Sequence, residues 1–341
     1  MDMISNSQAM ISLPWDKLYG CNVLVTGATG LIGSCIVNIL FENIGNSSRV
    51  YAAGRNELRA RKLFSRFWDK DNFIFLKYDV NYPLDSNVQF DYIIHAASNA
   101  SPYFFAEDPV GVMMSNLLGT KNLLDYGRKH GIKRFLYVSS GEVYGNGNVD
   151  RWKEDDCGYV NSMTIRSCYP TSKRAAETLC IAYSQEYNID VVVARPCHTY
   201  GAMFTEKDNR VFAQFVRNIL ANKNIVLKSK GEQFRSWIYV KDCAYAILTI
   251  LLKGKKCEAY NVADENSCVT IKELAHIFAC LGDVDVIFEL PTDNEKKGFS
   301  VMKKNIFDTS KLEKLGWKPS YNLRLGLKET IELAKLYNNQ V

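Results

Sequence analysis

Tyr169 and Lys173 are spaced so that they could move a proton to or from a substrate hydroxyl. They stand four residues apart in Tyr169-Pro-Thr-Ser-Lys173, and on a helix this spacing puts both side chains on one face, about one turn apart. A tyrosine with its ordinary pKa of about 10 is a poor base at neutral pH. A neighbouring ammonium group favours the phenolate and lowers that pKa. The pair therefore predicts a tyrosine base activated by a lysine.

Ser140 would complete this group. It follows a strand-like run that ends Val138-Ser139-Ser140, and its hydroxyl could hydrogen-bond the same substrate oxygen that Tyr169 deprotonates. A Tyr-x-x-x-Lys pattern alone is common by chance, so the strand before it and the glycine motif upstream carry much of the weight. Together these residues predict a catalytic Ser140–Tyr169–Lys173 group.

Three glycines near the N-terminus predict a dinucleotide site. They fall in Val23-Leu-Val-Thr-Gly27-Ala-Thr-Gly30-Leu-Ile-Gly33, after a hydrophobic strand and at the start of a helix. Gly27 permits a tight turn, Gly30 lets the backbone approach a pyrophosphate, and Gly33 allows close helix–strand packing. The free N–H groups at a helix start also attract phosphate. A purely structural glycine turn is the alternative. The predicted cofactor contacts in this segment are Gly27, Thr29, Gly30, Leu31, Ile32 and Gly33.

The end of the second predicted strand bears on the choice between NAD and NADP. An NAD site usually has an acidic residue here that binds the adenosine ribose hydroxyls, whereas this chain has Gly54 and Arg55. The guanidinium of Arg55 could bind a 2′-phosphate through charge-assisted hydrogen bonds, which favours NADP. A solvated arginine at the start of a charged helix is the alternative.

Short apolar strands alternate with amphipathic helices through the first two thirds of the chain. This order predicts an α/β fold with a Rossmann-like, doubly wound parallel sheet, whose ligands lie at the carboxyl ends of the strands. The predicted strands are Asn22–Thr26, Arg49–Ala53, Phe73–Tyr78, Tyr92–His95, Arg134–Ser139 and Asp190–Ala194, and the helices include Leu31–Asn43, Val112–Lys129 and Ser172–Glu186.

After Pro196 the alternation loosens, which predicts a smaller C-terminal α/β domain for substrate binding. We expect an NAD(P)-binding domain at residues 20–196 together with about 236–264, and a substrate-binding domain at 197–235 and 265–341. The helices expected here are Val211–Asn222, Asp242–Leu252, Ile271–Cys280 and Leu323–Leu336, and the strands are Ile225–Leu227, Ser236–Val240 and Glu258–Val262.

Composition excludes several other classes. The 42 basic and 37 acidic residues give a net charge of +5, and they are spread along the chain, so nothing calls for a nucleic-acid partner. The ten cysteines form no Cys-x-x-Cys pair and the four histidines have no ligand spacing, so we expect reduced core thiols and no metal site. No apolar run is long enough for a signal peptide or a membrane span, which predicts a soluble, cytoplasmic protein.

The chain resembles the extended branch of the short-chain dehydrogenase/reductase superfamily, the NAD(P)-dependent nucleotide-sugar epimerase/dehydratase family, and within it the UDP-glucuronate decarboxylases most. The resemblance runs from Asn22 to Leu336. Beside the motifs above it rests on Ser140-Gly-Glu142-Val-Tyr-Gly145, Arg195-Pro-Cys-His198-Thr-Tyr-Gly201, Arg235-Ser-Trp-Ile-Tyr-Val-Lys-Asp242, Tyr260-Asn-Val262 and Leu315-Gly-Trp-Lys-Pro319.

This resemblance implies the remaining cofactor contacts and a shared first step. Asp79 and Val80 would contact the adenine, and Ala96, Ala97 and Ser98 would run along the pyrophosphate and the nicotinamide ribose. In the family, the tyrosine takes the proton of a sugar hydroxyl, usually O4, while C4 passes a hydride to the nicotinamide. The product is a transient 4-keto sugar.

Glu142 is the residue that would direct the next step. Related sugar dehydratases have Asp-Glu where this chain has Gly141-Glu142, whereas UDP-glucuronate decarboxylases pair a small residue with the glutamate. The absent acid makes dehydration doubtful and favours a decarboxylase-like or epimerase-like outcome. The alternative for Glu142 is a carboxylate that binds local backbone N–H groups.

The resemblance also implies the substrate contacts, the substrate and the assembly. Arg235 would lie near the substrate diphosphate, and His198, where many relatives have asparagine, would form a wall beside it. The substrate would be a nucleotide-diphosphate sugar, and the family often dimerises through paired helices, here Val112–Lys129 and Ser172–Glu186. Three alternatives stay open: a net NADPH-dependent 4-keto-sugar reductase, a carbonyl reductase of non-nucleotide substrates, and a non-catalytic dinucleotide sensor.

Overall fold

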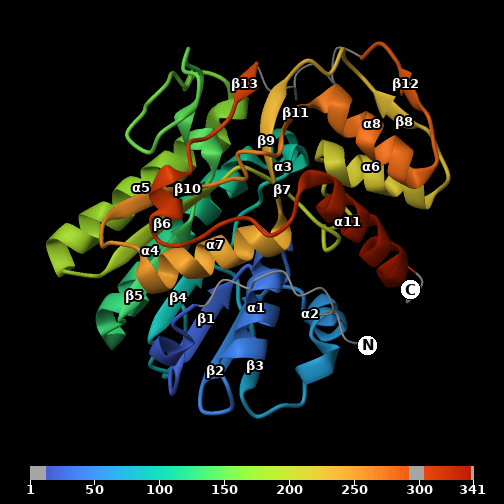
Figure 1. Cartoon of the computed structure of the whole chain (residues 1–341). Helices are drawn as coiled ribbons and strands as arrows, with labels where there is room; N and C mark the ends of the chain where they lie inside the picture. The colour runs from blue at the N-terminus through green and yellow to red at the C-terminus, as the bar shows by residue number, and fades with distance from the viewer. Residues whose placement is uncertain (1–12, 292–302, 339–341) are drawn as a thin grey trace.

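A seven-stranded parallel sheet forms the centre of the computed structural model, which describes residues 13–291 and 303–338 (Figure 1). Its strand order is β10-β6-β5-β4-β1-β2-β3, so the winding reverses between β1 and β4. Ligands of such sheets bind at this reversal, beyond the carboxyl ends of the strands. The strands are β1 (Asn22–Thr26), β2 (Arg49–Gly54), β3 (Phe73–Lys77), β4 (Tyr92–His95), β5 (Arg134–Val138), β6 (Val191–Pro196) and β10 (Glu258–Val262).

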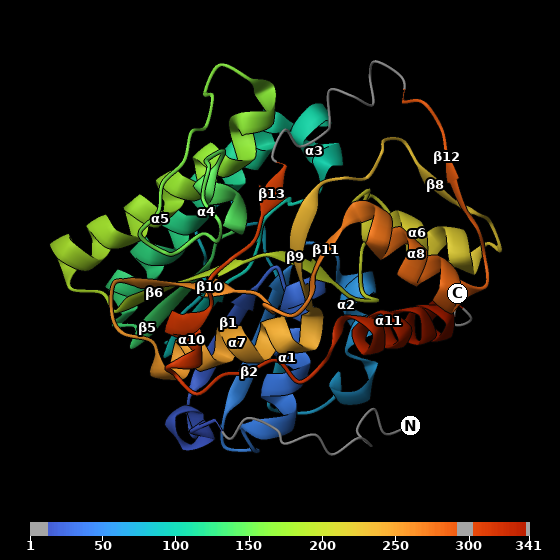
Figure 2. The same cartoon turned by 45° about the horizontal axis from the view of Figure 1, so that its top comes forward.

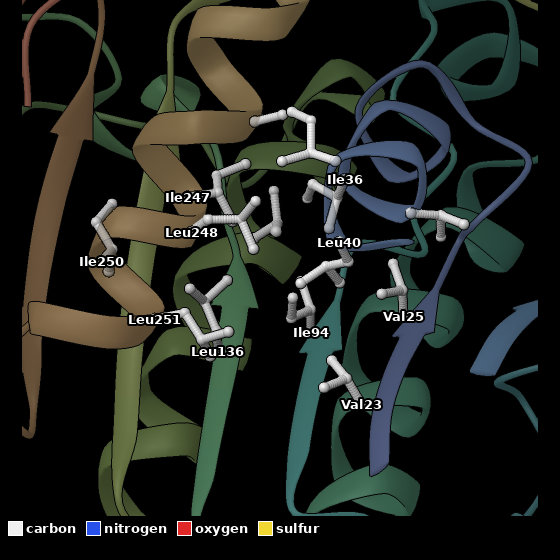
Figure 3. Close-up of a cluster of buried hydrophobic side chains, with 14 of the residues drawn as sticks. Val23, Val25, Ile36, Leu40, Ile94, Leu136, Ile247, Leu248, Ile250 and Leu251 are labelled. Carbon is white, nitrogen blue, oxygen red and sulfur yellow. The ribbon is translucent and has the colours of Figure 1, made fainter. Parts of the chain in front are cut away.

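Helices cover both faces of this sheet because side chains alternate along its buried strands. Val23 and Val25 of β1 point to the face covered by α1 and α7, as Figure 3 shows, whereas Leu24 points to the face covered by α4 and α5. The helices of this layer are α1 (Leu31–Asn43), α2 (Glu57–Leu63), α3 (Pro102–Glu107), α4 (Pro109–His130), α5 (Cys168–Tyr187) and α7 (Val240–Lys253), with the 3-10 helices η1 (Trp15–Leu18), η2 (Ser65–Phe67), η3 (Gly141–Tyr144) and η4 (Ile165–Ser167).

A second lobe with its own hydrophobic core lies beside the sheet (Figure 2). Its strands β7 (His198–Tyr200), β9 (Phe234–Tyr239), β11 (Cys268–Thr270) and β13 (Lys304–Asn305) form one small sheet, and β8 (Ile225–Leu227) pairs with β12 (Val286–Phe288). Among the described residues after Pro196, the helices other than α7 are α6 (Val211–Leu220), α8 (Ile271–Gly282), α10 (Ser310–Glu313) and α11 (Leu323–Asn338).

The predicted Rossmann-like, doubly wound fold is confirmed. The strands β7, β11, β12 and β13 were not predicted, and several helices start earlier than predicted. Helix α4 begins at Pro109 because Asp108 accepts the N–H of Gly111 and a proline suits the first helical position. Helix α5 begins at Cys168, four residues before the predicted start, since Pro170 is tolerated in the first turn. Tyr169 and Lys173 therefore lie on the first turns of one helix. Within residues 13–291 and 303–338, no helix is both long and apolar enough to cross a membrane.

Candidate active site

One cavity of about 1250 Å³ opens at the carboxyl ends of the central strands. We call it the main cavity. Every residue predicted to contact the cofactor lines it, although these residues come from five separate segments of the chain. They are Gly27, Thr29, Gly30, Leu31, Ile32, Gly33, Arg55, Asp79, Val80, Ala96, Ala97, Ser98, Tyr169 and Lys173.

The turn between β1 and α1 has the geometry that a pyrophosphate requires. Gly27 has a φ of 66°, and a Cβ there would lie 2.6 Å from the carbonyl oxygen of Ala96. A Cβ on Gly33 would lie 2.2 Å from the carbonyl oxygen of Gly27, so neither position has room for a side chain. Gly30, the N-cap of α1, provides no side-chain cap, and the first N–H groups of the helix remain available for phosphate oxygens. The turn and the cavity fit a dinucleotide.

Tyr169 and Lys173 are both buried, and burial changes the pKa of each. Burial raises the pKa of Tyr169 to about 12, and the charge of Glu142 acts in the same direction, while a hydrogen bond with Ser140 opposes them. Burial lowers the pKa of Lys173 to about 7. The Lys173 Nζ donates to the carbonyl oxygen of Val138 at 2.9 Å and lies 5.8 Å from the centre of the Tyr169 ring. The structure thus brings Ser140, Tyr169 and Lys173 together.

Phe105 contacts Tyr169, and Arg166 contacts Phe105 and Glu142; the sequence patterns revealed neither residue. The ring of Phe105 in α3 stacks on Tyr169 with centroids 4.8 Å apart. Arg166 places its guanidinium 4.6 Å from the Phe105 centroid and donates to Glu142 Oε1 at 2.8 Å. The only available signal was the position of Arg166, three residues before Tyr169.

Phe307 explains why residue 141 is a glycine. A Cβ on Gly141 would lie 2.3 Å from Cζ of Phe307, a distance that would force the ring to move. Phe307 is fully buried and packs against Tyr144 and Trp152 in a small core cluster. The space that an aspartate at position 141 would need is therefore filled, and Glu142 has no acidic neighbour there.

His198 and Arg235 lie on β7 and β9, outside the lining of the main cavity. Burial, helped by the charges of Arg235, Arg210 and Arg166, lowers the pKa of His198 to about 3, so its imidazole is neutral. Burial lowers the pKa of Arg235 to about 10, and the charge of Glu142 opposes this shift. The charge of Glu142 therefore acts on both Arg235 and Tyr169. Because its pKa is so low, His198 is better suited to form a wall of the site than to act as a base.

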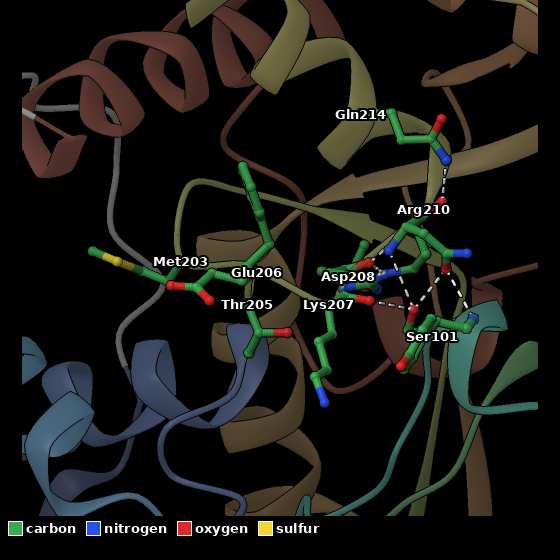
Figure 4. Close-up of polar contacts among 12 residues, drawn as sticks. Ser101, Met203, Thr205, Glu206, Lys207, Asp208, Arg210 and Gln214 are labelled. Carbon is green, nitrogen blue, oxygen red and sulfur yellow. Dashed lines mark hydrogen bonds and ion pairs between the residues drawn. The ribbon is translucent and has the colours of Figure 1, made fainter. Parts of the chain in front are cut away.

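The segment 202–210 forms another wall of the main cavity, to which all of its residues except Asn209 contribute, and Figure 4 shows some of its polar contacts. Arg59 of α2 connects this segment to the glycine turn, because it donates to the carbonyl oxygens of Thr29 and Met203, each at 2.9 Å. Arg217 donates to three further carbonyl oxygens of the segment. Ser101, which precedes α3, donates to Asn209 Oδ1 at 2.7 Å. No periodic pattern marks this segment, so the wall was not predicted.

Asn116 and His95 form hydrogen bonds that connect the segments lining the main cavity. Asn116 of α4 accepts a hydrogen bond from Ser98 at 2.8 Å and donates to Ser172 of α5 at 2.9 Å. It therefore joins the end of β4 to the helix of Tyr169. His95 is hydrogen-bonded to Thr26 at 2.8 Å, and burial lowers its pKa to about 3.

The chain belongs to the NAD dependent epimerase/dehydratase family, whose model matches residues 23–263. The predicted resemblance is thus confirmed, and the chain is an enzyme of this family.

Its relatives include UDP-glucuronic acid decarboxylases. It is 32% identical over 309 residues to UDP-glucuronic acid decarboxylase 6 of Arabidopsis thaliana, which covers 89% of this chain and 86% of the relative. It is 30% identical over 327 residues to UDP-glucuronic acid decarboxylase 1 of Xenopus tropicalis, which covers 93% and 74%. The crystal structure of UDP-glucose 4-epimerase with UDP-glucose from Thermotoga maritima matches with a TM-score of 0.80 and 25% identity over 94% of this chain and 100% of that one.

Proposed function

We propose that this enzyme decarboxylates UDP-glucuronate through a transient 4-keto sugar, with NAD(P) as its cofactor. The observation that carries the proposal is the pairing of Glu142 with Arg166 beside Tyr169, where Phe307 fills the space of any side chain at position 141. A 4,6-dehydration needs an acid next to that glutamate. Decarboxylation needs none, because carbon dioxide leaves without a proton. The names of the relatives agree with this choice.

The first step uses the Ser140–Tyr169–Lys173 group. The glycine turn Gly27–Gly33 would hold the pyrophosphate of the cofactor, which, when bound, accepts the hydride of C4 and later returns it. Tyr169 takes the proton of the O4 hydroxyl, and Ser140 hydrogen-bonds the same oxygen. The ammonium form of Lys173 favours the phenolate of Tyr169. The sugar then carries a ketone at C4.

Loss of carbon dioxide follows from the chemistry of this ketone. The C6 carboxylate is β to the C4 carbonyl, so the C5–C6 bond breaks and its electron pair moves to the C4 oxygen as an enolate. The hydroxyl groups of Ser140 and the protonated Tyr169 stabilise that oxygen by donating hydrogen bonds. Glu142 relays a proton from water to C5, and Tyr169 returns its proton to O4 at the end. Because the hydride also returns to C4, the reaction has no net oxidation.

The charges around the site suit a substrate with several negative groups. Arg235, Arg210 and Arg166 are each near enough to His198 for their charges to lower its pKa. A guanidinium binds carboxylate and phosphate oxygens through a planar pair of donors. A UDP-linked uronic acid supplies both kinds of group, whereas a neutral carbonyl substrate supplies neither.

Mass spectrometry of the products tests the proposal directly. Purified enzyme is incubated with UDP-glucuronate and with UDP-glucose, dTDP-, GDP- and CDP-sugars, each with and without added NAD(P)H. We expect UDP-glucuronate to lose the mass of carbon dioxide and UDP-glucose, which has no carboxylate, to keep its mass. Loss of water, gain of two hydrogens, or an isomer of unchanged mass would instead indicate a dehydratase, a reductase or an epimerase. If no sugar nucleotide changes or protects the protein thermally, the proposal is wrong.

We also propose that the cofactor is NADP rather than NAD. No acidic residue ends β2, and Arg55, Arg59 and Lys62 line the main cavity beyond it. The Arg55 side chain is 63% exposed and lies 4.0 Å from Asp79, so it is free to turn toward a 2′-phosphate.

Arg55→Ala should therefore weaken NADP binding and leave NAD binding unchanged. Loss of one charge-assisted contact of about 1.5–3 kcal/mol corresponds to a tenfold or larger rise in Kd. Titration of the wild type and the variant with both cofactors measures the Kd of each. Lys129→Ala, at the far end of α4, provides the control. Tighter binding of NAD by the wild type, unchanged in Arg55→Ala, would contradict the preference.

The remaining proposals concern location and assembly. We propose a cytoplasmic homodimer in which α4 and α5 of one copy pack against those of the other. Apolar side chains are exposed along these helices at Val110, Met114 and Leu118 of α4 and at Ile181 of α5. The division into a cofactor domain and a substrate domain also remains a proposal, in which β10 and α7 complete the cofactor domain from late in the chain.

A further inference from the structure

Arg166 connects Glu142 to the aromatic ring that packs on Tyr169. It lies in η4, immediately before α5, where the positive end of the helix dipole disfavours a cation. Its charge is met by Glu142 of η3, with Nη2 and Oε1 2.8 Å apart. Its flat face lies over Phe105, and Phe105 stacks on Tyr169. A single side chain therefore contacts Glu142 and the ring that packs on the tyrosine.

The contacts of Arg166 differ from those of arginines that hold the fold together. Arg174 donates to three backbone carbonyl oxygens, and Arg134 donates to Asp190 and to two backbone carbonyl oxygens. Arg166 has one hydrogen-bond partner among the residues that the structure describes, and its Nε is buried without any. A buried donor without a partner costs about 1–3 kcal/mol. The hydrogen bonds of Arg166 therefore contribute little to the stability of the fold.

The charge of Glu142 opposes ionisation of Tyr169, and the charge of Arg166 favours it. Burial raises the pKa of Tyr169, and among the neighbouring charges Glu142 raises it further, while Arg210 and Arg166 lower it. Lys173 also lies near the Tyr169 ring, but burial lowers its pKa to about 7, so it is only partly protonated at neutral pH. A carboxylate with no counter-charge so close to Tyr169 would oppose formation of the phenolate.

We propose that Arg166 is a positioning residue: it fixes the Glu142 carboxylate beside the reacting carbons and balances its charge next to Tyr169. The inference rests on the proposed function in one respect, the transfer of a proton by Glu142. It goes beyond that function because it assigns the orientation and the charge balance of Glu142 to a side chain that acts only through other residues.

The test compares Arg166→Gln, Arg166→Lys, Glu142→Gln and the double variant R166Q/E142Q in the complete enzyme with UDP-glucuronate and cofactor. Arg166→Gln should lower kcat on the order of 100-fold, as misplacement of a catalytic group does, with little change in KM. The rise of kcat with pH should move to higher pH, since the Tyr169 phenolate loses a favourable charge. Arg166→Lys should restore the pH profile and only part of kcat.

The double variant and a matched control separate this role from a structural one. If Arg166 acts through Glu142, the double variant should be no slower than Glu142→Gln alone. Arg134→Gln removes an ion pair of similar burial, with Nη2 2.7 Å from Asp190, and should lower Tm while leaving kcat and the pH profile unchanged.

The possible failures are distinguishable. A wild-type enzyme that releases no carbon dioxide from UDP-glucuronate overturns the proposed function before any variant is compared. With an active wild type, additive losses in the double variant, or a wild-type pH profile in Arg166→Gln, overturn the role of Arg166 alone. Outright unfolding of Arg166→Gln would also overturn it, because it would show that the side chain is needed for the fold.

Discussion

Tyr169→Phe should reduce turnover on the order of 1000-fold, the middle of the usual range for loss of a general acid–base group. The variant removes one oxygen atom, which is hydrogen-bonded with Ser140 and which receives the substrate proton in the proposed mechanism. The ring remains, so the stack with Phe105 at 4.8 Å persists and the wall of the main cavity keeps its shape. Steady-state kinetics give the loss in kcat, and titration of the cofactor should give a nearly unchanged Kd.

Tyr183→Phe is the matched control for this experiment. Tyr183 lies on the same helix, is also buried, and donates its hydroxyl to Asp125 at 2.7 Å, on a part of α5 that does not line the main cavity. We expect this variant to lose some stability and to keep its kcat. Retained turnover in Tyr169→Phe would exclude the tyrosine as the base and with it the mechanism above.

Glu142→Gln should separate the two halves of the reaction. The oxidation at C4 uses the Ser140–Tyr169–Lys173 group, so formation of reduced cofactor in a single turnover should persist. Completion of the cycle needs a proton at C5, and without the carboxylate the overall kcat should fall about 100-fold. Absorbance of the reduced nicotinamide measures the first half, and release of the decarboxylated sugar nucleotide measures the whole.

Asp190→Asn provides a control for the loss of a paired carboxylate. Asp190 pairs with Arg134 at 2.7 Å and precedes β6, at the opposite ends of the strands from the site. Its substitution should lower Tm without a change in either rate. The contrary outcome is that Glu142→Gln slows oxidation and decarboxylation equally. Glu142 would then act in the first step or bind local backbone N–H groups, which is the alternative role stated in the sequence analysis.

The cofactor side of the site was predictable because most of its segments follow directly after a strand. The end of a buried strand is visible as an apolar run that stops, and parallel strands bring these ends to one edge of the sheet. Gly27, Arg55, Asp79 and Ala96 therefore meet in the main cavity although they are spread over four strands. The predicted bounds of β1, β4 and α1 match the structure for the same reason.

The substrate side was less predictable because its contacts join irregular segments. Arg166 meets Glu142 across the loop between η3 and η4, and no periodicity reports that contact. Phe307 reaches the space beside Gly141 from the far end of the chain. The glycine itself was visible, but the ring that excludes any larger residue was not, since packing between distant segments leaves no trace in local sequence.

The position of α7 in the chain has a consequence for synthesis on the ribosome. Ile247, Leu248 and Leu251 of this helix cover the face of the sheet that contains Val23 and Leu136 (Figure 3). A nascent chain that ends at the last residue of β6 holds six of the seven central strands, yet that face still lacks its α7 cover. Exposed apolar surface of this kind favours aggregation and chaperone binding. A gene fragment cut after β6 should therefore yield insoluble product, because the Rossmann half of this enzyme matures only after its C-terminal half begins to emerge.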